Sequence, residues 1–87
     1  MLNVKELSVL YGIAYGLEVK EIAHILGVSR GTIQAWLKNA CIKLGCGNRT
    51  YAVVKAIKLE LLDLGMITYR KTINSSLDSN YRELIRA

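Results

Sequence analysis

Gln34, Ala35 and Lys38 place a long amide, a small apolar side chain and a long cation within one short stretch of the chain. The carboxamide of Gln34 can pair with N6 and N7 of an adenine, and the ammonium of Lys38 can reach a guanine or a phosphate. The methyl group of Ala35 permits close approach and can touch a thymine methyl. These side-chain types predict readout of base edges in the major groove of double-stranded DNA.

Five further residues have the chemistry of phosphate contacts. They stand at or near predicted helix starts, where side chains and backbone N–H groups can meet phosphate oxygens: Lys20, Ser29, Arg30, Thr32 and Arg49. Contacts of this kind position a protein on DNA without specifying a sequence. For Arg49 a second interpretation stays open, since a basic residue beside Asn48 can instead hold the loop against the preceding helix.

The residues that could support catalysis or bind a metal do not form a recognisable set. The sequence has no nucleophile paired with a general base and no cluster of carboxylates, so we expect no enzymatic activity. Cys41, Cys46 and the single His24 fall short of the four ligands of a structural zinc site. We therefore predict no metal and no cofactor, and thiols that are reduced and serve packing.

The candidate base-reading residues fall on the second helix of a predicted helix-turn-helix, residues 19–38. Ala23 is the small residue at the helix contact, Gly27 can take the left-handed conformation of the turn, and Ser29 can cap the next helix. That helix is predicted over residues 30–44, because apolar residues recur on one face at three- and four-residue steps: Ile33, Leu37, Ala40 and Leu44. An ordinary helical hairpin is the alternative interpretation.

A first helix is predicted from Asn3, which can cap it, to Gly16, with Glu6 positioned to close a capping box. Together with the helix-turn-helix and a fourth helix that begins near Arg49, it makes an all-α, four-helix domain. The chain has no proline that would interrupt these helices. We assign the domain to residues 1–67.

The fourth helix is predicted to continue to Gly65, and its outward face is apolar. This face consists of Tyr51, Val54, Lys58, Leu61 and Leu62, and we expect it to form a two-fold dimer interface. Residues 68–87 follow as a C-terminal tail that ends with the spacing of a short amphipathic helix, with Tyr81, Leu84 and Ile85 on one side. The tail either covers the edge of the interface or folds back over the face within one subunit, and its end can equally be frayed.

Size and charge agree with a small domain that binds a polyanion. The chain has 87 residues, a net charge of +5 and a pI near 9.4. Its hydrophobic content of 52% is high for so small a core, which indicates that some apolar surface meets another chain. No stretch reaches the roughly 18 apolar residues of a membrane span, and the amino terminus lacks a signal-peptide pattern. We therefore expect a cytoplasmic location and no membrane association.

Four stretches of sequence go beyond a generic helix-turn-helix. They are LNVKELSVL at residues 2–10, GLEVKEIA at 16–23, LGVSRGTI at 26–33 and KLGCGNRT at 43–50. With them the chain resembles the DNA-binding domain of the LuxR/GerE (also FixJ-type) transcription regulators. The last stretch is the most specific, because generic helix-turn-helix proteins do not share it. The resemblance implies a four-helix domain that binds near promoters, usually as a dimer on two half-sites.

The chain departs from the family pattern at several positions. Gln34 stands where members often have Lys, so the preferred DNA site is expected to differ from that of common members. Trp36 replaces a usual His and is predicted to pack rather than intercalate. Glu18 stands where a Ser or Thr cap is common, and its carboxylate repels a nearby phosphate. The fourth helix is predicted to be longer than in the family by about five residues.

These observations predict a stand-alone, sequence-specific transcription regulator that binds double-stranded DNA as a homodimer, with residues 30–44 as the recognition helix. One alternative is a small interaction module that pairs with a larger LuxR-type regulator through the fourth helix. Another is a promoter module like region 4 of sigma factors, whose partner would be RNA polymerase. The KLGCGNRT stretch argues against that last alternative.

Overall fold

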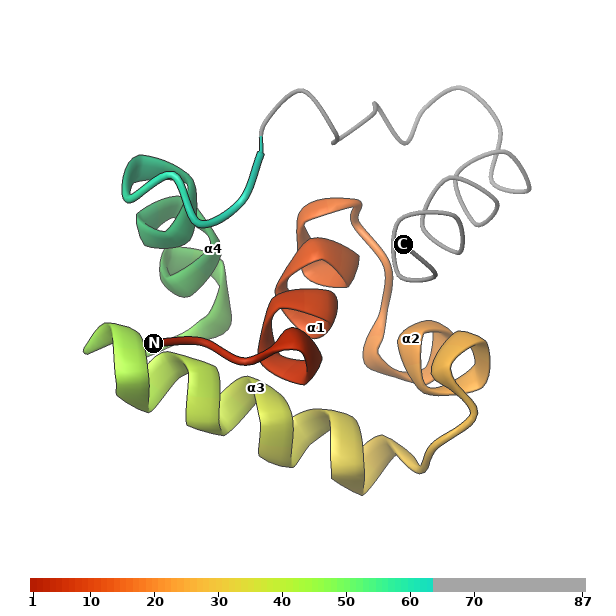
Figure 1. The fold of residues 1–87 in the computed structure, drawn as a ribbon. Helices are drawn as coiled ribbons and strands as arrows, with labels where there is room; N and C mark the ends of the chain where they lie inside the picture. Colours follow the sequence, from red (N-terminus) through yellow and green to blue (C-terminus); the bar gives the residue numbers. More distant parts are fainter. Residues whose placement is uncertain (64–87) are drawn as a thin grey trace.

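A computed structural model describes residues 1–63, which fold into four helices (Figure 1). They are α1 (Val4–Ala14), α2 (Val19–Leu26), α3 (Arg30–Leu44) and α4 (Arg49–Lys58). No strand occurs within the described residues, so the predicted all-α, four-helix class is confirmed. The predicted tail of residues 68–87, with its proposed contacts from Tyr81, Leu84 and Ile85, lies outside this range.

Local hydrogen bonds determine where the helices start, and the residue types in the sequence predict these bonds. At α1, the backbone N–H of Glu6 donates to Asn3 Oδ1 over 2.8 Å, and the N–H of Asn3 donates to Glu6 Oε1 over 3.0 Å. The expected capping box is therefore present. At α4, the N–H of Tyr51 donates to the side chain of Asn48 over 2.8 Å. At α2, the N–H of Glu18 donates to Glu21 Oε1 over 2.8 Å, the bond that the acid of a capping box makes with the N-cap backbone.

The core lies where α1 packs against α3 and α4, while α2 packs against the first part of α3 (Figure 1). Each helix contributes apolar side chains from one face. The buried apolar residues are Leu2, Val9, Leu10, Tyr15, Leu17, Ile22, Ala23, Ile33, Leu37, Ala40, Leu44, Ala52, Val53, Ala56 and Leu62. The four residues predicted to form the inner face of α3 all belong to this set.

The turn between α2 and α3 has the geometry that the motif requires. Gly27 adopts φ 71°, ψ 32°, the left-handed conformation that an L side chain rarely takes. A Cβ at this position would meet no atom within 4 Å, so the need for glycine comes from the backbone angle and not from crowding. The N–H of Val28 then donates to the carbonyl of Ala23 over 3.0 Å, which fixes the direction in which α3 begins.

The fourth helix ends at Lys58, so the prediction that it continues to Gly65 is wrong. Glu60 adopts φ 60°, and the N–H groups of Glu60 and Leu61 donate to the carbonyls of Ile57 and Ala56. This pair of bonds is a Schellman motif, which satisfies the last carbonyls and reverses the chain. The longer helix expected from comparison with the family is therefore absent.

The reversal after α4 carries Leu62 into the core, where it is only 2% exposed. Leu61 is half-buried and packs against the same core. The N–H of Asp63 donates to the hydroxyl of Tyr11 on α1 over 2.8 Å, which holds the segment in place. Leu61 and Leu62 therefore do not lie on the outward face of α4, and their assignment to a dimer interface is corrected.

Within residues 1–63, the structure contains no helix long and apolar enough to cross a membrane.

Candidate nucleic-acid interface

An open groove of about 920 Å³ runs past the beginnings of α2, α3 and α4. It brings together Lys20, Arg30, Gln34 and Arg49, four of the residues predicted to contact DNA. Because these residues come from three helices, their convergence is a property of the fold. The rest of the lining is Ile13, Gly16, Leu17, Glu18, Val19 and Gly31.

Charge in this groove is predominantly positive. Lys20, Arg30 and Arg49 line it, against the single carboxylate of Glu18. Lys20 Nζ lies 3.8 Å from Glu18 Oε1, but the two side chains are 69% and 68% exposed, so this ion pair is weak. The expected repulsion between Glu18 and a phosphate is therefore offset by neighbouring cations, and the groove suits a polyanion.

The outer face of α3 is open. Gln34, Ala35 and Lys38 are exposed, while the opposite face of the helix is buried in the core. Gln34 borders the groove, and Ala35 and Lys38 extend the exposed strip beyond it. Within the described residues, nothing of the chain covers this strip, which carries the full set of candidate base-reading side chains.

Ser29 and Thr32 are tied to each other at the start of α3. Ser29 Oγ accepts the N–H of Thr32 over 3.1 Å, and the two hydroxyl oxygens lie 2.9 Å apart. The predicted cap is confirmed. When Thr32 donates the hydroxyl bond, the proton of Ser29 stays available for a phosphate oxygen, so capping does not prevent contact.

Arg49 and Trp36 were the two residues with competing interpretations. Arg49 is exposed and lines the groove, and the start of α4 is held by the side chain of Asn48 instead. The placement of Arg49 therefore favours a role in the groove. Trp36 is half-buried and packs against the core, as predicted. Lys5 has no role predicted from sequence, but its ammonium lies 5.5 Å from the ring centroid of Trp36. No local signal connects these two residues, since they lie on different helices.

The thiols and the histidine show no arrangement for metal binding. Within residues 1–63, no group of three or more His, Cys, Asp and Glu side chains could hold a metal ion. Cys41 and Cys46 are free and half-buried, and burial raises the pKa of the Cys41 thiol. A raised pKa favours the unreactive protonated form. His24 is exposed on α2.

The outward face of α4 retains three of its predicted members. Tyr51, Val54 and Lys58 are exposed and recur at three- and four-residue steps along the helix, so they share one side. Leu59, directly after the helix, is exposed as well. We refer to Tyr51, Val54 and Lys58 as the α4 face.

A helix-turn-helix whose second helix is exposed beside a cationic groove defines a class of DNA-binding domain. Within that class the family is clear, because residues 1–56 match the family model of the bacterial regulatory proteins of the luxR family. The chain belongs to the LuxR family. Its described helices form the DNA-binding domain of a LuxR-type transcription regulator.

Curated relatives agree with this assignment. The HTH-type quorum sensing-dependent transcriptional regulator VjbR of Brucella ovis is 42% identical over 64 residues, 74% of this chain and 25% of that protein. The transcriptional regulatory protein YdfI of Bacillus subtilis is 43% identical over 63 residues, 72% of this chain and 30% of that protein. The transcriptional activator protein CarR of Pectobacterium carotovorum is 34% identical over 61 residues, 70% of this chain and 25% of that protein.

The chain thus spans 25–30% of the length of these relatives. No solved structure matches it.

Proposed function

We propose that this chain binds double-stranded DNA sequence-specifically, with α3 in the major groove, and regulates transcription by that binding and not by catalysis. The observation that supports this most strongly is the groove in which Lys20, Arg30 and Arg49 converge beside exposed Gln34. Cations at the border of an exposed helix can neutralise phosphates while that helix reads bases.

In this proposal, three exposed side chains of α3 read base edges. Gln34 pairs with an adenine, Ala35 touches a thymine methyl, and Lys38 reaches a guanine or a phosphate. Five residues hold the DNA backbone: Lys20, Ser29, Arg30, Thr32 and Arg49. The helix starts place their side chains and N–H groups where phosphate oxygens can accept from them.

Steep salt dependence is the first expected result. If two copies together neutralise about six phosphates, affinity for a preferred duplex should fall on the order of 10³-fold between about 50 and 200 mM salt. Fluorescence anisotropy on a duplex selected from a random pool measures this directly. A selected sequence with two-fold symmetry would support binding as a dimer, whereas a flat salt response would contradict the mechanism.

Replacing Gln34 by Ala should mainly reduce discrimination. The substitution removes the bidentate partner of one base pair, so the preference for that base pair should fall by about 1–3 kcal/mol. Anisotropy on the selected duplex and its single-base-pair variants measures the change. The matched comparison is Arg30→Met, which should weaken all sequences equally because Arg30 is assigned to the backbone. Uniform weakening by Gln34→Ala would demote Gln34 to a backbone contact.

We further propose that two copies pair through the α4 face. A single module buries only about 600–1,000 Å² on DNA, so one copy with few phosphate contacts binds weakly. Tyr51 and Val54 are exposed apolar side chains in a position to pack against a symmetry-related copy. A second LuxR-type regulator is the alternative occupant of the same face.

Val54→Asp should therefore prevent pairing, because it places a carboxylate at the centre of the α4 face. At high micromolar concentration, the wild-type chain should sediment as a dimer. The variant should sediment as a monomer. Val4→Asp is the matched control, since Val4 is also an exposed valine but lies on α1. A wild-type chain that stays strictly monomeric would refute self-pairing, and a mixture with a LuxR-type relative then tests the alternative.

A further inference from the structure

Lys5 and Trp36 form a contact between α1 and α3 that the assignment of DNA-binding residues leaves unused. Lys5 Nζ lies 5.5 Å from the centroid of the indole ring. Lys5 is exposed on the first turn of α1, while Trp36 is half-buried and held by the core. The ring therefore attracts the ammonium without neutralising its charge.

The position of Trp36 on α3 determines which flank Lys5 occupies. Gln34 and Trp36 are two residues apart, which corresponds to about 200° around the helix. They border the exposed strip of Ala35 and Lys38 from opposite sides. Gln34 faces the groove that Lys20, Arg30 and Arg49 line, and Lys5 stands on the other flank.

A helix in a major groove has a phosphate backbone on each side. The groove is about 12 Å wide, and an α-helix with its side chains is about 10–12 Å across, so its two flanks face different strands. The groove cations lie on the Gln34 flank and therefore face one of these two strands. On the Trp36 flank, Lys43 is bound to the Glu6 carboxylate over 2.9 Å, whereas within residues 1–63 Lys5 makes no ion pair.

We propose that Lys5, positioned by the ring of Trp36, donates to a phosphate of the strand opposite the one held by the groove cations. This inference rests on the proposed DNA binding and extends the interface from α2, α3 and α4 to α1. Trp36 is then a positioning residue, and Lys5 an additional backbone contact that does not discriminate among sequences.

The test is anisotropy across a salt series, with the full chain and its selected duplex. Lys5→Met should lower the slope of log affinity against log salt by about 0.9 for each bound copy and weaken all duplexes equally. Lys55→Met removes the same charge from the last turn of α4, where the ammonium lies beside Gly45 at the C-terminus of α3, nine residues along the chain from Trp36, and should leave the slope unchanged. Thermal unfolding of both variants controls for loss of fold.

Trp36→Leu keeps an apolar side chain but removes the aromatic face. It should reduce affinity in the wild-type background and much less in the Lys5→Met background, because the two residues act together. Trp36 is the single tryptophan of the chain, so its fluorescence reports this contact directly. Duplex addition should change the emission of the wild-type chain and change that of Lys5→Met much less.

Two results would overturn the inference, and they are distinguishable. If Lys5→Met keeps the wild-type slope and affinity while Arg30→Met reduces both, Lys5 does not touch DNA, and the proposed function stands. If the wild-type chain shows no salt-dependent binding to any duplex, the proposed function fails, and the role of Lys5 fails with it.

Discussion

Ile33→Ala is expected to destabilise the domain by roughly 2–5 kcal/mol. Ile33 is fully buried on the inner face of α3, opposite the exposed strip that carries Gln34 and Lys38. Removing its outer carbons leaves a cavity beneath the recognition helix, which the surrounding helices fill only in part. Urea denaturation followed by circular dichroism measures the free energy of unfolding.

The same helix provides a matched control. Ile42 is 66% exposed, so Ile42→Ala should change the free energy of unfolding by less than about 0.5 kcal/mol. Ile33→Val removes one carbon. Its loss of free energy of unfolding should lie between those of the two alanine substitutions, at about 0.5–1.5 kcal/mol. Equal effects of the two alanine substitutions would contradict the assignment of inner and outer faces on which the candidate interface depends.

The helix-turn-helix was predictable because its determinants are local. Ser29 caps α3 by a bond to a backbone group three residues ahead, and Gly27 supplies the left-handed turn within its own residue. The inner face of α3 follows from the helical repeat alone, because apolar residues at three- and four-residue steps must lie on one side. Each of these features can be inferred without knowledge of any distant segment.

The end of α4 was not predictable in the same way. Leu59, Leu61 and Leu62 continue an apolar pattern that a longer helix would also satisfy, and position 60 is Glu rather than the Gly or Asn that usually marks such a turn. What ends the helix is tertiary, because Leu62 is buried in the core and Asp63 bonds Tyr11 on α1. The burial of Leu62 favours the reversal over continued helix.

The candidate interface was predicted residue by residue but not as an arrangement. Lys20, Arg30 and Arg49 were each selected because they stand near a helix start, and that criterion contains no distances between helices. The groove that joins them depends on how α2, α3 and α4 pack together. The contact between Lys5 and Trp36 had no sequence signal at all, since a lysine near an N-terminus and a half-buried tryptophan are each ordinary.

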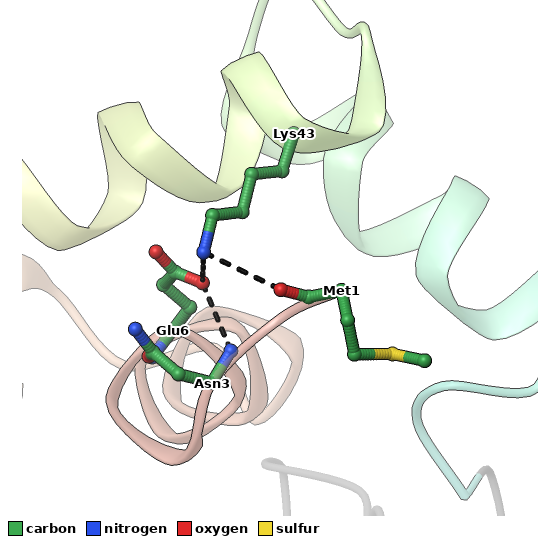
Figure 2. Close-up of polar contacts among 4 residues, drawn as sticks. All are labelled: Met1, Asn3, Glu6 and Lys43. Carbon is green, nitrogen blue, oxygen red and sulfur yellow. Dashed lines mark hydrogen bonds and ion pairs between the residues drawn. The ribbon is translucent and has the colours of Figure 1, made fainter.

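Lys43→Met should produce the second large loss of stability. Lys43 Nζ donates to Glu6 Oε1 over 2.9 Å and to the carbonyl of Met1 over 3.3 Å, and so joins the end of α3 to the start of α1 (Figure 2). Glu6 is only 3% exposed, so removing its cation leaves a buried carboxylate with fewer partners. Loss of one partner of a buried pair costs roughly 3–5 kcal/mol. Since the Lys43 side chain is 40% exposed, we expect about 2 kcal/mol.

The pH dependence of stability separates this ion pair from simple packing. Burial raises the pKa of Glu6, but the hydrogen bonds from Lys43 and from the N–H of Asn3 lower it by more, so the pKa lies below its ordinary value of 4.5. The unfolded chain therefore takes up the proton first as the pH falls. The stability that Glu6 contributes is present above about pH 4.5 and is lost as the pH falls through the folded-state pKa.

Glu6→Gln and Lys43→Met should both reduce the loss of stability as the pH falls. Denaturation at a series of pH values between about 5 and 3 would measure this dependence. Glu6→Gln keeps an acceptor for the N–H of Asn3, so it should preserve the capping bond while it removes the titrating group. Lys55→Met removes a cation that Glu6 does not contact. It should leave the dependence of the free energy of unfolding on pH as it is in the wild type. If all three variants and the wild type lose stability in parallel, the pair does not titrate as described, and the packing of α1 against α3 must instead be maintained by the apolar core alone.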